Sequence, residues 1–242
     1  MNELPRAILF DLDDTIVSAY GKPELAWKAV IGEFSGDLGA LSQAQTVDAI
    51  GAAAREFWAD AERHRVWRQK MHEARREIVA QGFARLAAAG QAVPPAGFQR
   101  RLADRFSDYR NESMSLFPDA HATIDTLRAR GVKLALITNG ASEHQREKIV
   151  RFDLTHRFDH IQIEGEHGFG KPEDRAYRHA LQTLGVAAHE TWIVGDNLEW
   201  EVIAPQRLGI HAIWYDPHGD GVPAGHAAKP DRIVRTLSEL LD

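Results

Sequence analysis

The sequence predicts an α/β fold, a doubly wound parallel Rossmann-like sheet with an inserted all-helical domain. Short apolar runs of strand length, the first at Ala7–Phe10, alternate with amphipathic helical stretches through the second half of the chain. Between the first run and the later ones, residues 24–110 show helical spacing alone. We therefore expect a core of residues 1–19 and 112–242 and a helical domain of residues 20–111.

The composition narrows the classes of partner. With 242 residues and a formal net charge of -6, the chain lacks the excess of basic residues that nucleic-acid binding requires, so the expected partner is a small molecule held by a few basic groups.

The sequence shows no membrane-spanning or signal segment. No stretch reaches the roughly 18 apolar residues that a membrane span needs, and no apolar signal segment precedes the first strand. Cysteine is absent, and the twelve histidines lack the sequence spacing of a metal cluster. We expect a cytoplasmic protein that binds no membrane, either a monomer or a homodimer.

The first strand ends in a group of carboxylates. Because side chains alternate along a strand, Asp11 and Asp13 should emerge on one side while Leu12 packs on the other. Open α/β sheets bind ligands at the carboxyl ends of their strands, and two adjacent like charges repel unless a proton or a metal lies between them. The same residues with Asp14 also fit an ordinary turn.

The helical stretch that follows is predicted to hold about four helices. Ser42 and Gln45 form a capping-box pattern, and apolar residues follow them at steps of three and four. Gly90 and the Pro94–Pro95 pair interrupt the pattern before the last helix.

Four further apolar segments are predicted strands of the same sheet. Three are clear, Val132–Ile137, Thr191–Val194 and Ile210–Tyr215, and His160–Ile163 is weaker. Right-handed crossovers between parallel strands bring the strand ends to one edge of the sheet.

Local signals predict where the intervening helices start. Asp119 is a candidate N-cap, Ser142 with Gln145 forms a second capping-box pattern, and Pro172 suits the first position of a helix. The closing segment, Asp231–Leu241, has the spacing of an amphipathic helix.

Polar residues stand at the predicted strand ends and helix starts on one side of the sheet. They are Asp11 with Asp13, Thr138, Lys171 and Asp196. Each alone has an ordinary explanation, as a turn residue, an N-cap or a solvated lysine. Together, in this order, they are what phosphoryl transfer needs. A cation held by Asp11 and Asp196 would offset the repulsion between a carboxylate and a phosphate, and oxygen ligands favour Mg2+.

Each catalytic candidate has a role in this chemistry. Asp11 would attack phosphorus and form an aspartyl-phosphate. Asp13 would protonate the leaving alkoxide and then activate water. Thr138 and Lys171 would bind the transferring phosphoryl oxygens and stabilise their charge.

The sequence resembles the haloacid dehalogenase superfamily over essentially the whole chain. Its four motifs are similar to Asp11–Thr15, Ile137–Gly140, Gly170–Glu173 and Val194–Asn197, in the family's order. The resemblance implies a capped phosphatase, in which a helical C1-type cap, here residues 20–111, closes over the site and reads the leaving group.

The resemblance also implies further site residues. Asp13 offers its backbone carbonyl to Mg2+, which makes Asp11, Asp13 and Asp196 the expected metal ligands. Asn139 joins Thr138 and Lys171 in binding the phosphoryl group.

Two positions depart from the family pattern. Glu201 stands where many relatives carry a second aspartate, so its part in the metal site stays open. Pro205 lies in what is usually a continuous helix, which it should kink or restart.

The expected function is Mg2+-dependent hydrolysis of a small phosphorylated metabolite. The alternatives are a 2-haloacid dehalogenase, a phosphomutase of the same fold and an inactive phosphate-binding module. Asp13 argues against the dehalogenase, because a departing halide needs no proton. Thr15 favours hydrolysis over a mutase, and four filled catalytic positions argue against an inactive module. No motif indicates the natural substrate.

Overall fold

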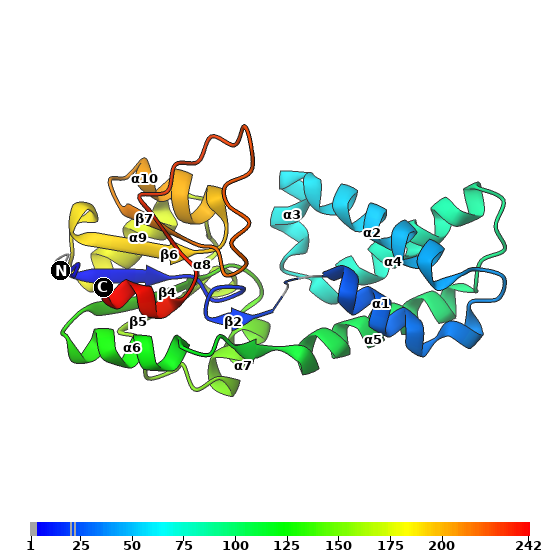
Figure 1. Ribbon diagram of the computed structural model, residues 1–242, viewed down its shortest axis with the longest axis horizontal. Helices are drawn as coiled ribbons and strands as arrows, with labels where there is room; N and C mark the ends of the chain where they lie inside the picture. Colours follow the sequence, from blue (N-terminus) through cyan, green and yellow to red (C-terminus); the bar gives the residue numbers. More distant parts are fainter. Residues whose placement is uncertain (1–3, 20, 22) are drawn as a thin grey trace. The chain divides into compact units, whose positions relative to one another are not determined.

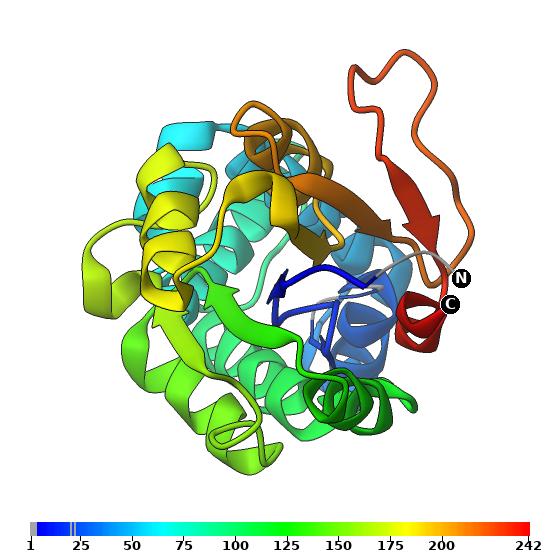
Figure 2. The same cartoon turned by 90° about the vertical axis from the view of Figure 1, so that its left-hand side faces the viewer.

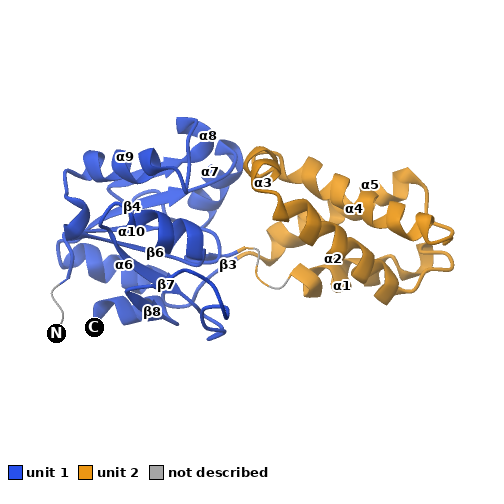
Figure 3. Cartoon of the chain, turned by 90° about the horizontal axis from the view of Figure 1, so that it is seen from above, with its two compact units in different colours: residues 1–18, 115–242 blue, residues 19–114 orange. Residues whose placement is uncertain are grey.

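The computed structural model describes residues 4–19, 21 and 23–242, and the chain forms two compact units (Figure 3). Unit 1 comprises residues 1–18 and 115–242, and unit 2 comprises residues 19–114. Residues 1–3, which precede the first strand, and residues 20 and 22, at the predicted start of the helical domain, lie outside the described residues. Among the described residues, none of the helices combines the length and the hydropathy that a membrane crossing requires.

Unit 1 is built on six parallel strands in the order β5-β4-β1-β6-β7-β8 (Figures 1 and 2). The strands are β1 (Ala7–Phe10), β4 (Lys133–Thr138), β5 (His160–Ile163), β6 (Thr191–Gly195), β7 (His211–Tyr215) and β8 (Arg232–Val234). β1 lies between β4 and β6, so the first strand joins the sheet from across the helical insertion. The predicted doubly wound α/β fold is confirmed.

Helices cover both faces of this sheet (Figure 2). The helices and short elements of unit 1 are α6 (Ala120–Ala129), α7 (Ser142–Arg151), α8 (Glu164–His167), α9 (Asp174–Leu184), η2 (Ala188–Glu190), η3 (Leu198–Ile203), α10 (Ala204–Gln206) and η4 (Leu237–Leu241). Ala7 and Leu9 of β1 pack in one cluster with Tyr177 and Leu181 of α9. A strand buried on both faces is apolar at every position, which is why β1 is recognisable in the sequence.

Unit 2 is all-helical. Its elements are α1 (Pro23–Glu33), η1 (Ser35–Asp37), α2 (Gln43–Ala59), α3 (Ala61–Trp67), α4 (Met71–Ala88) and α5 (Ala96–Ser113). The capping box at Ser42 is confirmed, since Ser42 Oγ accepts from Gln45 N at 3.2 Å and Gln45 Oε1 accepts from Ser42 N at 3.0 Å. The described residues of unit 2 hold five α-helices where about four were predicted, because Asp60 accepts a hydrogen bond from Arg63 N at 2.6 Å and starts α3 directly after α2.

The closing segment differs from the predicted helix over residues 231–241. Residues Arg232–Val234 form the edge strand β8, and only Leu237–Leu241 turn, as the 3-10 helix η4. Ile233 and Val234 are β-branched and pair with Trp214 and Tyr215 of β7. Strand pairing of these residues prevails over the helical spacing of the segment.

One predicted helix start is confirmed and another is wrong. Asp119 holds the N-cap position of α6, although its side chain makes no capping hydrogen bond there and its Oδ2 accepts from Ser238 N at 2.6 Å. Pro172 does not open a helix, since α9 begins at Asp174 after a turn in which Glu173 N donates to Gly170 O at 2.9 Å.

The chain leaves and re-enters unit 1 through a short two-stranded ribbon. β2 (Val17–Ser18) and β3 (Ser115–Leu116) pair antiparallel, with Val17 opposite Leu116. The sequence predicts no strand at either segment, because a strand of two residues is too short to leave a pattern.

Candidate active site

The register of the central strands places the predicted site residues together. Phe10 pairs with Leu136 of β4 and with Val194 of β6. Asp11, which follows Phe10, therefore stands between the carboxyl end of β4, where Thr138 lies, and that of β6, which Asp196 follows. This edge is where open parallel sheets bind their ligands.

A buried ion pair lies at the centre of the site. Lys171 is 1% exposed and Asp11 is 8% exposed. Lys171 Nζ lies 2.5 Å from Asp11 Oδ1 and 2.7 Å from Glu201 Oε1. Thr15 Oγ1 donates to the other oxygen of Asp11 at 3.3 Å.

The three charges shift one another's pKa. Burial lowers the pKa of Lys171, but the charges of Asp11 and Glu201 outweigh it and hold the pKa above its usual value, so the amine is protonated. Burial raises the pKa of Asp11 despite the opposing effect of Lys171. Burial likewise raises the pKa of Glu201 to about 7, with Lys171 opposing and Asp11 adding to the shift.

Local packing fixes Glu201 against Lys171. Glu201 is fully buried, and its Oε2 accepts from Asn197 N at 2.9 Å. A Cβ atom on Gly195 would overlap Cγ of Glu201, so only glycine fits at the end of β6. Glu201 sits in the π-helical turn η3, which ends just before Pro205 in α10. The predicted interruption at Pro205 is therefore present, as a change of helix type.

The Asn139 side chain holds the backbone of Lys171. Asn139 Nδ2 donates to Lys171 O at 2.7 Å, and Asn139 Oδ1 accepts from Lys171 N at 2.9 Å. Gly170, the preceding residue, approaches so closely that a Cβ atom there would overlap Asn139 Oδ1. The amide of Asn139 therefore positions Lys171, and only its main chain stays available for a ligand.

The structure adds two residues of α7 to the site. Lys148 Nζ lies 2.7 and 2.9 Å from the two carboxylate oxygens of Asp13, and Gln145 Nε2 lies 2.9 Å from Asp13 Oδ2. Gln145 Nε2 is also 2.6 Å from Thr138 Oγ1. The sequence signal that could have identified Gln145 and Lys148 is their spacing, since polar residues three apart in a helix share a face.

This arrangement overturns the second predicted capping box. Ser142 is the first residue of α7 rather than its N-cap, and Ala141 holds the N-cap position. Ser142 Oγ donates to Glu166 Oε1 at 2.9 Å. The Gln145 side chain points to the site instead of back to the start of the helix.

The carboxylates at this edge fit a divalent cation. Asp196 is exposed, yet partial loss of hydration and repulsion from Asp11, Glu201 and Asp14 raise its pKa well above the usual value. A cation would relieve this repulsion. The carboxylates of Asp11 and Asp196 and the backbone carbonyl of Asp13 are oxygen donors of the kind that Mg2+ prefers.

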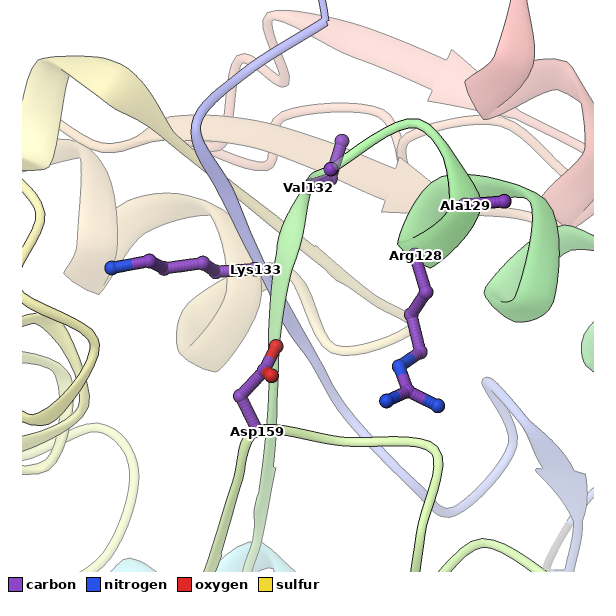
Figure 4. A pocket seen from close by; sticks show the side chains of 6 residues that line it. Arg128, Ala129, Val132, Lys133 and Asp159 are labelled. Carbon is purple, nitrogen blue, oxygen red and sulfur yellow. The ribbon is translucent and has the colours of Figure 1, made fainter.

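A pocket in unit 1 lies away from these residues, at the start of β4 rather than its end. It is lined by Arg128, Ala129, Gly131, Val132, Lys133 and Asp159 (Figure 4). Lys133 Nζ donates to Leu184 O at 2.6 Å, and Asp159 Oδ2 accepts from Leu134 N at 2.8 Å. Arg128 donates to His156 O at 2.9 Å. The charged groups of this pocket are thus bound to backbone atoms, and we do not assign a ligand to it.

Comparison with known proteins finds relatives over the length of the chain. The haloacid dehalogenase-like hydrolase family matches residues 5–209. The phosphoserine phosphatase of Thermus thermophilus is 33% identical over 97% of each chain, and the ribulose-1,5-bisphosphate 5-phosphatase of Halopiger xanaduensis is 30% identical over 98% of each. A magnesium-bound structure of YfnB from Bacillus subtilis has a TM-score of 0.68 and 21% identity, and covers 98% of this chain and 97% of that one.

Replacing Lys171, whose ammonium group lies between the carboxylates of Asp11 and Glu201, should destabilise unit 1. Lys171→Met leaves the buried carboxylates of Asp11 and Glu201 without their partner, so we expect the free energy of unfolding to fall by about 3 kcal/mol in metal-free buffer. The double variant Lys171→Met/Glu201→Gln should recover part of this loss, because one carboxylate is neutralised. Urea denaturation measures both.

The matched control is Lys229→Met. Lys229 is exposed, so its replacement should change the free energy of unfolding by less than about 0.5 kcal/mol. Equal stabilities of Lys171→Met and Lys229→Met would contradict the assigned role of the ion pair.

Proposed function

The chain belongs to the haloacid dehalogenase-like hydrolases, and we propose that it hydrolyses a small phosphate monoester with Mg2+, through an aspartyl-phosphate on Asp11. The observation that carries this proposal is the ion pair of Asp11 with Lys171 at the strand edge that also holds Asp13, Thr138 and Asp196. The two curated relatives named above act on different small phosphorylated metabolites. These relatives support a phosphatase of this family, and we assign neither relative's substrate to this chain.

Asp11 is the proposed nucleophile. Lys171 opposes the rise in the pKa of Asp11 that burial causes and so favours the charged carboxylate, and Thr15 holds the second oxygen at 3.3 Å. A carboxylate fixed by two partners loses little orientational freedom when it attacks phosphorus.

Asp13 is the proposed acid and base. A proton on its carboxyl group would pass to the departing oxygen of the ester, and the carboxylate would then take a proton from the attacking water. Lys148 and Gln145, at 2.7 and 2.9 Å, hold this carboxylate in place. We assign both as positioning residues.

The proposed phosphoryl-binding groups are Lys171 Nζ, Thr138 Oγ1 and the main chain of Asn139. They come from β4 and from the loop before α9, which the Asn139 amide ties together. Mg2+ held by Asp11, Asp13 and Asp196 would supply further positive charge against the phosphate. Glu201, which faces Lys171, is proposed to position that amine rather than to bind the metal.

We propose that the helical domain, residues 20–111, is the cap of this phosphatase, and that residues 1–19 and 112–242 form its core. Support comes from the all-helical fold of unit 2 and from the β2–β3 ribbon through which the chain enters and leaves it. The partner is proposed to be a small phosphorylated metabolite. The cytoplasmic location and the monomeric or homodimeric state stay predictions of the sequence.

The cap assignment predicts where substrate selectivity resides. When residues 20–111 are replaced by a short linker, the differences in kcat/KM among a panel of phosphorylated metabolites should become smaller, because the leaving-group contacts are removed. Turnover of para-nitrophenyl phosphate, measured on the same samples, should persist, because the aryl group needs few contacts. Unchanged ratios of kcat/KM across the panel would assign selectivity to the core instead.

The roles of the two aspartates predict different covalent products. Asp13→Asn, mixed with an aryl phosphate and Mg2+, should accumulate a phosphate adduct on Asp11 that is visible by mass spectrometry. An aryl oxygen leaves with little protonation, whereas hydrolysis of the intermediate needs the missing base. Asp11→Asn should form no adduct, and EDTA should prevent the adduct in Asp13→Asn.

The same experiment separates the alternative reactions. Treatment of Asp13→Asn with 2-chloropropionate should leave Asp11 unmodified, whereas a dehalogenase would form an alkyl ester there. A phosphate adduct on Asp13 in the Asp11→Asn variant would mean that Asp13 is the nucleophile and Asp11 the acid and base. The absence of any phosphate adduct would count against the proposed intermediate.

A further inference from the structure

Three histidines of unit 1 form a group that the proposed phosphatase chemistry does not use. His160 is the first residue of β5, His167 is the last residue of α8, and His179 lies in α9. One ring nitrogen of each lies within 4.8 Å of those of the other two. The sequence shows no metal-binding spacing among its histidines, but the fold brings these three together because α8 and α9 both pack beside β5.

Hydrogen bonds fix two of the rings through the same ring nitrogen. His167 Nδ1 lies 3.1 Å from Ile163 O, and His179 Nδ1 lies 2.9 Å from Gln162 Oε1. A ring that donates from Nδ1 to an oxygen keeps the lone pair on Nε2, as metal-binding histidines usually do. Gln162 is itself held, because its Nε2 donates to Ala176 O at 3.0 Å.

The third ring leaves a buried nitrogen unsatisfied. His160 Nε2 is buried and has no hydrogen-bond partner among the described residues. Buried polar atoms without partners are rare in folded proteins.

We propose that His160, His167 and His179 bind a transition-metal ion, which we assign as Zn2+. Zn2+ is commonly held by three imidazoles with a fourth position left open, and imidazole nitrogen selects such ions over Mg2+. The site is thus chemically distinct from the oxygen site at Asp11 and Asp196.

The ligands lie close in the chain to the segment that carries Lys171. His167 is followed by the loop Gly168–Gly170, which leads directly to Lys171. The ring of Phe169 in this loop lies 5.6 Å from the rings of both His167 and His179. A metal bound to the three histidines would hold β5, α8 and α9 together beside the loop Gly168–Gly170, which positions Lys171 near Asp11.

The test is Zn2+ binding to the intact chain in excess Mg2+, without substrate. We expect the wild-type chain to bind one equivalent of Zn2+ that Mg2+ does not displace, measured by dialysis and metal analysis. Co2+ in the same site should give the visible absorption of tetrahedral coordination. Zn2+ at about 100 times its Kd should raise Tm by roughly 5 °C.

Matched variants decide whether the histidines are the ligands. His167→Gln and His179→Gln should each lose the Zn2+ equivalent, with at least a tenfold rise in Kd, and should lose the Co2+ spectrum. His156→Gln, at an exposed histidine of the same unit, should bind as the wild type does. Circular dichroism of each variant without Zn2+ establishes that the fold is retained.

Two results would overturn the proposal. One is a wild-type chain that binds no stoichiometric Zn2+, and the other is retention of the wild-type Kd by both folded ligand variants. Because no turnover is measured, these results are independent of the proposed phosphatase activity.

Discussion

The buried ion pair between Lys171 and Asp11 is the interaction on which the rest of unit 1 depends. Its two residues are 160 positions apart in the sequence. Removing two charges from water costs several kcal/mol per ion, and only close contact between them offsets that cost. The neighbouring residues are accordingly constrained. Gly170 and Gly195 leave no room for a Cβ atom, and the Asn139 amide holds the Lys171 backbone from both sides.

The parallel sheet supplies the second constraint. β1 is flanked by β4 and β6 in a register that ends all three strands at one edge, so residues just beyond them converge. This convergence made much of the site predictable. A short apolar run that ends in Asp11 and Asp13, followed by similar runs that end at Thr138 and Gly195, places polar groups together once the strands are taken as parallel.

Contacts between distant elements limited the prediction. Gln145 and Lys148 reach Asp13 from α7, and no local pattern in α7 reveals that the face they share meets the end of β1. Asp119 and Ser142 are good capping residues by type, but Ser238 and Glu166 engage their side chains instead.

Competition between patterns explains the other errors. The spacing of residues 231–241 suits a helix, yet pairing with β7 at the sheet edge converts Arg232–Val234 to a strand. The histidine group escaped notice because its members come from β5, α8 and α9, and sequence spacing detects only ligands that share one element or turn.

The central claim is that Asp11, held by Lys171, carries the phosphoryl group between two displacements. The most direct measurement is the stereochemical course at phosphorus, with a phosphorothioate monoester made chiral by oxygen isotopes and hydrolysed in isotopically labelled water. Each in-line displacement inverts the configuration at phosphorus, so two displacements through Asp11 predict net retention in the released thiophosphate. Net inversion would mean a single direct attack by water and would contradict the account.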